Sequence, residues 1–251
     1  MEHNVAIVTG GSRGIGRAIA HALAASGHRV LLSYRDREAD AAAVVDRIKR
    51  EDGEAHCMRA DMSVPRDVKA LAQSALDNFG RIDVLVNNAG VHIPGLRLAD
   101  VTPEQWARLL QVNLTGPLQL TQAVLPHMRS RRSGCVINLS SNVTQRMPAG
   151  YGVYTVSKVA LEAFTRILAK EEGPNGIRVN AVAPGPVRTD MLQETLDLMG
   201  AERAHAFLKS VPLARAGEPE EIAATVAFLA SNAASYLTGQ VIYVNGGGPG
   251  G

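Results

Sequence analysis

The chain has 251 residues, of which 46% are apolar, and a formal net charge of +2. This size and composition allow one large domain with a substantial core, and so small a net charge gives no electrostatic reason to expect a nucleic-acid partner. No apolar run approaches the roughly 20 residues of a membrane span. The two cysteines do not make a disulfide framework, and the seven histidines have no ligand-type spacing, so we predict no catalytic metal.

Strand-like and helix-like stretches alternate along the chain. The alternation predicts an α/β fold with a doubly wound parallel sheet of about seven strands and helices on both faces, in one domain over residues 1–251. The first strand begins so early that no room is left for a signal peptide, and we expect a cytoplasmic protein. The expected strands are 5–9, 29–34, 54–60, 82–86, 134–139, 177–182 and 240–244; the expected helices are 14–26, 38–52, 65–79, 103–128, 153–172 and 219–230.

Residues 189–214 break this alternation, because helical segments with apolar residues lie there between a strand and the last helix. We interpret 189–214 as a substrate lid rather than an ordinary helical insertion, since Pro184-Gly185-Pro186 just before it would form a stiff boundary. The glycine-rich residues 246–251 are expected to be disordered at their very end.

The turn after the first expected strand contains Gly10, Gly14 and Gly16. It follows the apolar stretch 5–8 and precedes a helical stripe of apolar residues that starts at Ile15. Strand, glycine turn and helix in this order are typical of dinucleotide binding in a Rossmann-type fold, where the backbone approaches a pyrophosphate and the helix start attracts its charge. A tight connection without a ligand is the alternative; with both flanks correct, we predict nucleotide binding.

The end of the second expected strand indicates which nucleotide binds. NAD-preferring proteins of this architecture place an acidic residue there to bond the ribose 2′-OH. Here the strand leads into Ser33-Tyr34-Arg35, and Arg35 together with Arg13 in the glycine turn can pair with a 2′-phosphate. We therefore predict NADP(H). Asp36 follows directly, and solvated loop charges are the alternative interpretation of these residues.

Two further polar motifs lie where ligands are expected. The apolar run 84–86 ends in Asn87-Asn88-Ala89-Gly90, at the carboxyl end of a strand, which is where ligands bind in open α/β sheets. Asn113 lies within the expected helix 103–128 but off its apolar stripe, which by itself indicates solvent exposure or a local bend.

Tyr154 and Lys158 are four residues apart, so they lie one turn apart on the same face of the expected helix 153–172. A phenol titrates near pH ~10, and a neighbouring cation lowers its pKa. Lowering it by roughly three pH units corresponds to about 4 kcal/mol and would produce a usable general acid or base. Such a pair is common in helices, so its weight comes from the other motifs.

Together these motifs resemble the short-chain dehydrogenase/reductase family, and the resemblance covers the whole chain. Segments 176–180 and 237–241 are also similar to the 3-oxoacyl-[acyl-carrier-protein] reductase type. The features that match the family are the TGxxxGxG turn at 9–16, NNAG at 87–90, Asn113, Ser141, YxxxK at 154–158 and Pro184-Gly185.

The resemblance implies an NADP-dependent oxidoreductase in which Tyr154 delivers a proton to a ketone and Ser141 holds the carbonyl oxygen. It further implies that Lys158 lowers the pKa of Tyr154 and bonds the nicotinamide ribose, while Asn113 holds a water near Lys158. Asp61 would contact the adenine. The residues implied to hold the cofactor are Gly10, Ser12, Arg13, Gly14, Ile15, Gly16, Arg35, Asp61, Met62, Asn88, Ala89, Gly90, Tyr154, Lys158, Pro184, Gly185, Val187 and Thr189.

The predicted reaction is reduction of a 3-oxoacyl thioester, linked to an acyl carrier protein or to CoA, to the 3-hydroxyacyl form. Carrier proteins are acidic, so a basic patch beside the active-site entrance would favour them. Arg129, Arg131 and Arg132 form such a cluster, although cations at a helix C-terminus are also simply favourable. Asn175 stands where related reductases often carry a second basic residue, which weakens the carrier-protein interpretation.

Two other functions remain open. The first is a reductase of a free small ketone in a specialised pathway, for which Gln145 and Arg146 beyond Ser141 would meet a polar substrate. The second, more remote, is a non-catalytic cofactor sensor. Helices 103–128 and 153–172 carry apolar residues on more than one face, and the family commonly packs them against a partner's, so a homotetramer or a homodimer is expected.

Overall fold

The computed structural model describes residues 4–248, and it confirms the predicted parallel sheet. Seven strands follow the order β3-β2-β1-β4-β5-β6-β7, and every neighbouring pair is parallel. The expected disorder at the end of the chain concerns 249–251, which lie outside the described residues. The strands are β1 Val5–Val8, β2 Arg29–Tyr34, β3 Ala55–Arg59, β4 Val84–Asn87, β5 Gly134–Leu139, β6 Ile177–Pro184 and β7 Val241–Val244.

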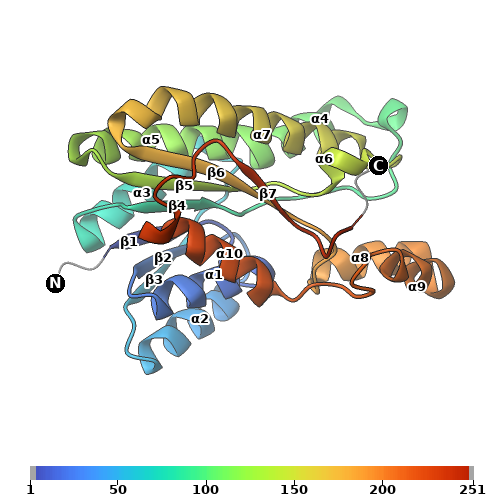
Figure 1. Ribbon diagram of the computed structural model, residues 1–251, viewed down its shortest axis with the longest axis horizontal. Helices are drawn as coiled ribbons and strands as arrows, with labels where there is room; N and C mark the ends of the chain where they lie inside the picture. The colour runs from blue at the N-terminus through green and yellow to red at the C-terminus, as the bar shows by residue number, and fades with distance from the viewer. Residues whose placement is uncertain (1–3, 249–251) are drawn as a thin grey trace.

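Helices cover both faces of the sheet, with two cores between the three layers (Figure 1). Strand β1 shows why its sequence is apolar throughout: Ala6 and Val8 face one core, Val5 and Ile7 the other, and all are fully buried. One face carries α1 Gly14–Ala25, α2 Glu38–Arg50 and α10 Pro219–Ala230; the other carries α3 Pro65–Phe79, α5 Gly116–Arg131 and α7 Gly152–Glu172.

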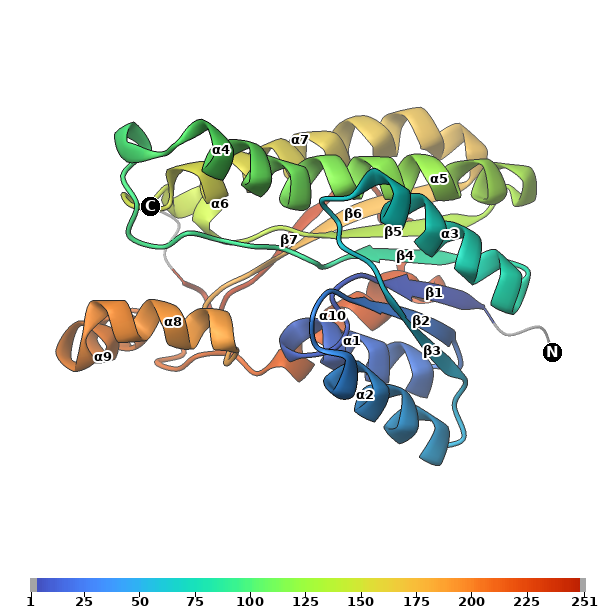
Figure 2. The same ribbon diagram turned by 180° about the vertical axis from the view of Figure 1, so that it is seen from behind.

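The remaining helices are short and gather towards one end of the sheet, as both views show (Figures 1 and 2). They are α4 Pro103–Leu110, α6 Val143–Arg146, α8 Asp190–Met199 and α9 Ala201–Lys209. Helices α8 and α9 lie within the expected segment 189–214, and neither contains a buried residue. Within residues 4–248, no helix combines the length and apolar character needed to cross a membrane.

The single helix expected at 103–128 is wrong in one respect. A π-helical turn at Gln111–Thr115 separates α4 from α5, and α5 continues to Arg131. Such a turn fits an extra residue into the helix and rotates the residues after it. Here it turns Asn113 inward until it is fully buried, and it brings Gly116 so near the Met62 carbonyl that a Cβ would lie 2.5 Å from that oxygen.

Candidate active site

A cavity of about 620 Å³ opens at the carboxyl ends of the central strands, where the strand order reverses between β1 and β4. All eighteen residues predicted to hold a cofactor line this cavity, and so does Ser141. Asn113 is the predicted site residue that does not line it, because it is buried behind Val112 and Gly90. Segments far apart in the sequence therefore meet at one place.

The glycine turn at the end of β1 leaves no room for side chains. A Cβ on Gly16 would lie 2.2 Å from the Gly10 carbonyl oxygen, and Gly10 and Gly14 have φ angles of +65° and +52°. Helix α1 begins with no side chain capping its first turn and no acidic residue in that turn. Its first N–H groups and its dipole therefore face the cavity as an anion site. These residues fit the pyrophosphate of a dinucleotide.

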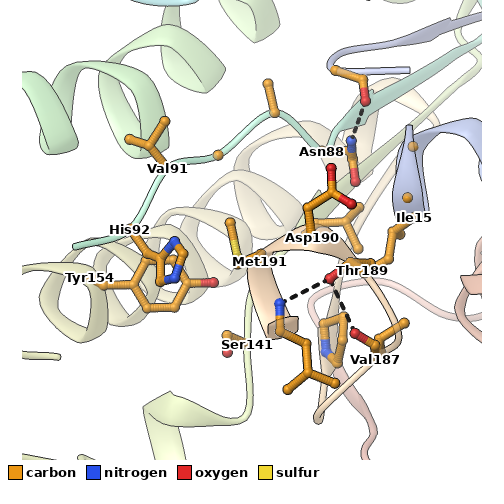
Figure 3. A pocket seen from close by; sticks show the side chains of 18 of the residues that line it. Ile15, Asn88, Val91, His92, Ser141, Tyr154, Val187, Thr189, Asp190 and Met191 are labelled. Atoms are coloured by element: carbon orange, nitrogen blue, oxygen red, sulfur yellow. Dashed lines mark hydrogen bonds between the residues drawn. The ribbon is translucent and has the colours of Figure 1, made fainter. Parts of the chain in front are cut away.

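Hydroxyl groups fasten the glycine turn to the neighbouring strand. Thr9 Oγ1 accepts hydrogen bonds from the backbone N–H groups of Asn88 and Ala89, both at 3.0 Å. The Asn88 side chain donates in return to the carbonyl oxygens of Thr9 at 2.8 Å and Gly10 at 3.1 Å. Figure 3 shows Asn88 beside the turn. Thr9 was not predicted as a site residue, although its place at the end of β1 would have indicated it.

Three arginines surround the adenosine end of the cavity. Arg13 pairs with Asp190, Arg35 pairs with Asp36, and Arg37, which was not predicted, lies 3.7 Å from Asp190. Every one of these pairs is at least partly exposed, so each can exchange its partner at little cost. No carboxylate occupies the end of β2 itself, where Ser33 instead accepts a hydrogen bond from the Gly10 N–H at 3.2 Å.

Asp61 also lines the adenosine end of the cavity. Its carboxylate accepts hydrogen bonds from the backbone N–H and the hydroxyl of Ser63, at 2.8 and 2.7 Å. Burial would raise its pKa, but these bonds and the charge of Arg35 outweigh burial and hold the pKa below the ordinary value. The side chain is thus an ionised acceptor at neutral pH.

Tyr154 lies at the other end of the cavity, and Figure 3 shows its hydroxyl directed inward. Burial raises the pKa of Tyr154 to about 12, although a hydrogen bond with Ser141 acts in the opposite direction. The lowered phenol pKa expected from the sequence is therefore wrong for this geometry. The phenol is protonated throughout the neutral range, which is the form that donates a proton.

Lys158 explains why the expected lowering of the Tyr154 pKa does not occur. Its Nζ lies 5.6 Å from the centroid of the Tyr154 ring and donates a 2.6 Å hydrogen bond to the Leu139 carbonyl oxygen. The side chain is buried, and this burial lowers the pKa of Lys158 to about 8. The ammonium group is thus near the phenol but directed at the end of β5.

Asn113 holds the π-helical turn against two other elements. Its Oδ1 accepts from the Val91 N–H, and its Nδ2 donates to the Val91 carbonyl, both at 2.9 Å. Nδ2 also donates to Ser157 Oγ at 3.1 Å, and that hydroxyl donates to the Tyr154 carbonyl at 2.7 Å. Ser157, which no sequence motif singles out, thus links Asn113 to the helix that carries Tyr154.

Ser140 and Tyr151 are the serine and the tyrosine nearest in sequence to Ser141 and Tyr154, and both of their hydroxyls bond to other side chains. Ser140 also lines the cavity, but its hydroxyl donates to the buried Glu162 carboxylate at 2.8 Å, whereas the Ser141 hydroxyl is near Tyr154. The Tyr151 hydroxyl donates to Thr195 on α8 at 3.2 Å. Ser141 and Tyr154 therefore stay the predicted catalytic serine and tyrosine.

The expected basic patch beside the entrance is wrong. Arg129 pairs with Glu172, and Arg131 with Asp83 at 3.2 Å. Arg132 donates to the Pro174 carbonyl at 2.8 Å. Helix α5 runs against the strand direction, so its C-terminus lies where the strands begin, beside Asp83, and the cavity lies at their opposite ends. These arginines therefore form structural contacts at the edge of the sheet where the strands begin.

Residues 10–248 match the family model described as Enoyl-(Acyl carrier protein) reductase. The chain is 43% identical over 251 residues to the short-chain reductase protein NovJ of Streptomyces niveus, and the matched region covers 99% of this chain and 95% of NovJ. It is 42% identical over 244 residues to a 3-oxoacyl-[acyl-carrier-protein] reductase of Synechocystis sp., which covers 97% of this chain and 96% of that protein.

Two solved structures share the fold. A blue fluorescent protein from a metagenomic library, in complex with NADPH, has a TM-score of 0.89 and 36% identity over 97% of each chain. A 7α-hydroxysteroid dehydrogenase, complexed with NADH and 7-oxo glycochenodeoxycholic acid, has a TM-score of 0.93 and 33% identity over 99% of this chain and 95% of that chain. The two structures hold different nicotinamide cofactors.

Proposed function

The chain belongs to the short-chain dehydrogenase/reductase family, oxidoreductases that act on CH–OH groups with a nicotinamide cofactor, and we propose that it reduces a ketone with NADPH. The proposed substrate is a 3-oxoacyl thioester, reduced to the 3-hydroxyacyl form. The observation that carries this proposal is the Tyr154 hydroxyl, which is directed into the cavity that Ser141 also lines and whose raised pKa, about 12, keeps it protonated at neutral pH.

The reduction requires a hydride and a proton, and the chain's residues divide the task. Gly10–Gly16, Asn88–Gly90 and Thr189 would hold a nicotinamide cofactor, which would supply the hydride. Ser141 holds the ketone oxygen and Tyr154 donates the proton as negative charge develops on that oxygen. Lys158 supplies positive charge that stabilises the negative charge developing in the site, although its ammonium is directed at the Leu139 carbonyl and does not lower the pKa of Tyr154. Asn113 holds the backbone at Val91 and, through Ser157, the Tyr154 turn in place.

The proposed preference for NADPH rests on charge at the adenosine end. Arg13, Arg35 and Arg37 line that part of the cavity, and the residue that ends β2 is Tyr34 rather than an aspartate or glutamate. Guanidinium groups pair well with phosphate oxygens. The exposed partners Asp36 and Asp190 hold these arginines only weakly, so a 2′-phosphate can displace them.

The thioester is supported by the similarity to a 3-oxoacyl-[acyl-carrier-protein] reductase. The location of Arg129, Arg131 and Arg132 removes one argument for docking of a carrier protein. A free ketone in a specialised pathway is the second candidate, and Arg146 favours it. The Arg146 guanidinium lines the cavity, lies 5.2 Å from the centroid of the Phe207 ring, and forms no ion pair with the described carboxylates.

Assembly through α7 is part of the proposal. Leu120, Val124 and Leu161 belong to the protomer's own core, which removes them from the apolar faces considered above. Val159 and Ile167 on α7 remain 39% and 57% exposed. These two side chains support a contact with a second copy of the chain, which light scattering of the wild type and an Ile167→Glu variant would test.

The function is tested by following NADPH oxidation by absorbance with a short 3-oxoacyl thioester, beside NADH and a Tyr154→Phe variant. NADPH-specific turnover that falls about 10²–10⁴-fold in the variant is expected, because general acids typically contribute that much. Turnover with simple ketones but not with the thioester would transfer the assignment to the second candidate. NADPH binding without turnover on any ketone would favour the cofactor sensor.

A further inference from the structure

His92 is a polar side chain that lines the cavity beside Tyr154 and that the proposed reaction does not use. It follows Val91, which Asn113 fixes by two hydrogen bonds, so its backbone is held firmly. Its ring lies edge-to-face against Tyr154, with centroids 6.2 Å apart and an interplanar angle of 67°. Figure 3 shows the two rings side by side at the wall of the cavity.

The imidazole of His92 is buried, and one of its two ring nitrogens, Nε2, is left without a hydrogen-bond partner among the described residues. Only 6% of the side chain is exposed. The Glu194 carboxylate on α8 approaches it, but Oε2 lies 3.9 Å from Nε2, which is beyond hydrogen-bond reach. A buried donor left without an acceptor is destabilising, so such an atom in a ligand cavity indicates an acceptor on the ligand.

The surroundings of His92 define the charge of that acceptor. Burial lowers the pKa of His92, and the nearby Glu194 carboxylate only partly offsets this, so the ring is neutral at pH 7. The Glu194 carboxylate favours the tautomer with its proton on Nε2, since that places an N–H towards the negative charge. The same carboxylate would repel a second anion brought to Nε2. An uncharged oxygen fits this position.

We propose that His92 determines substrate specificity, its Nε2–H donating to an uncharged carbonyl oxygen next to the ketone that Tyr154 and Ser141 hold. The proposal rests on the proposed ketone reduction and deepens it. In a 3-oxoacyl thioester this second oxygen belongs to the thioester group, which stands two carbons from the ketone. His92 thereby selects 1,3-dicarbonyl substrates over simple ketones.

A matched pair of substrates isolates this contact. Ethyl 3-oxobutanoate carries the second carbonyl, and 4-ethoxybutan-2-one has the same chain with a CH₂ in its place. In His92→Phe, kcat/KM for the oxoester is expected to fall about tenfold, the loss of one hydrogen bond, and kcat/KM for the ether ketone less than about twofold. His92→Gln, which keeps an N–H at a similar reach, should retain most of the selectivity.

Glu194→Gln distinguishes specificity from a contact that merely holds α8. If His92 and Glu194 only hold helix α8 in place, His92→Phe and Glu194→Gln will each raise KM by the same factor for the two substrates. That result would overturn the proposal. Equal losses on both substrates with a lowered melting temperature in His92→Phe would also overturn it, as a structural effect. If the wild type turns over neither ketone, the proposed function and this inference are rejected together. If the wild type turns both over and the His92 variants keep its ratio of kcat/KM for the two substrates, the inference alone is rejected.

Discussion

The nucleotide end of the cavity is built largely from backbone, whereas the substrate end is built from side chains of α6, α7, α8, α9 and the loop after β4. At the nucleotide end, the glycine turn has no room for side chains, and the buried Thr9 hydroxyl ties it to the end of β4. At the substrate end, α8 and α9 contain no buried residue and touch the cavity through contacts such as Tyr151 to Thr195. Steric limits therefore fix the geometry of the nucleotide end, whereas the side chains at the substrate end can change without disturbing the fold.

This difference predicts that a single methyl group will disable the nucleotide end. Gly16→Ala places a Cβ 2.2 Å from the Gly10 carbonyl oxygen, and the turn must open to relieve that clash. We expect NADPH affinity to fall below detection and the free energy of unfolding to drop by about 1–3 kcal/mol. Fluorescence titration with NADPH and thermal unfolding measure both. Gly173→Ala, where nothing lies within 4 Å, is the control and should behave as wild type.

The catalytic cluster, at the boundary between the two regions, is expected to respond to pH through Lys158. Burial holds the pKa of Lys158 at about 8 and raises that of Tyr154 to about 12. The reductive kcat/KM should be constant near pH 6–7 and fall about tenfold per pH unit above about 8, as Lys158 loses its charge while Tyr154 stays protonated. A fall that begins only above about pH 10 would assign the titration to the phenol instead.

A charge change at the nucleotide end should alter the choice of cofactor without altering the fold. Arg35→Ala removes a charge-assisted contact to a 2′-phosphate, so the Kd for NADPH should rise about tenfold while that for NADH stays unchanged. Isothermal titration with both cofactors is the measurement. Arg47→Ala on the same face of the molecule, whose guanidinium pairs with Glu51 on the exposed side of α2, serves as the matched control. Equal losses for both cofactors would contradict the NADPH assignment.

The smallest effect is expected at the substrate end. Phe207→Ala removes the ring that lies 5.2 Å from the Arg146 guanidinium and loosens α9 at the cavity. An exposed cation–π contact contributes about 0.5–1 kcal/mol, so KM should rise about two- to fivefold with NADPH affinity unchanged. Steady-state kinetics with a series of ketones would show it. A loss of NADPH affinity as large as that of Gly16→Ala would abolish the distinction between the two regions.

The same contrast explains which features the sequence predicted. The glycine turn, the strand ends and the pair of Tyr154 and Lys158 are local patterns, and the structure brings them to one cavity. The π-helical turn was missed because the apolar stripe continues across it, and only the tertiary contacts of Asn113 with Val91 require it. Arg129 was placed beside the entrance because local composition does not give the direction in which α5 runs.

His92 shows the limit of sequence reasoning at the substrate end. Its neighbours Tyr154 and Glu194 come from α7 and α8, so no local pattern brings the three side chains together. The elevated pKa of Tyr154 was missed for a related reason: spacing places Lys158 near the phenol, but burial and the bond from Lys158 to Leu139 decide the charge that the phenol experiences.

Burial of Lys158 has a consequence for how this protein can be improved. Its pKa falls from 10.5 to about 8 on folding, so the unfolded chain binds more protons between these values and stability rises with pH across that window. At neutral pH the buried ammonium lowers stability by an amount on the order of 3 kcal/mol. Replacing it by an apolar side chain would remove that penalty and the charge beside Tyr154 together. Screening variants for heat resistance alone would therefore enrich for well-folded proteins that have lost the reaction.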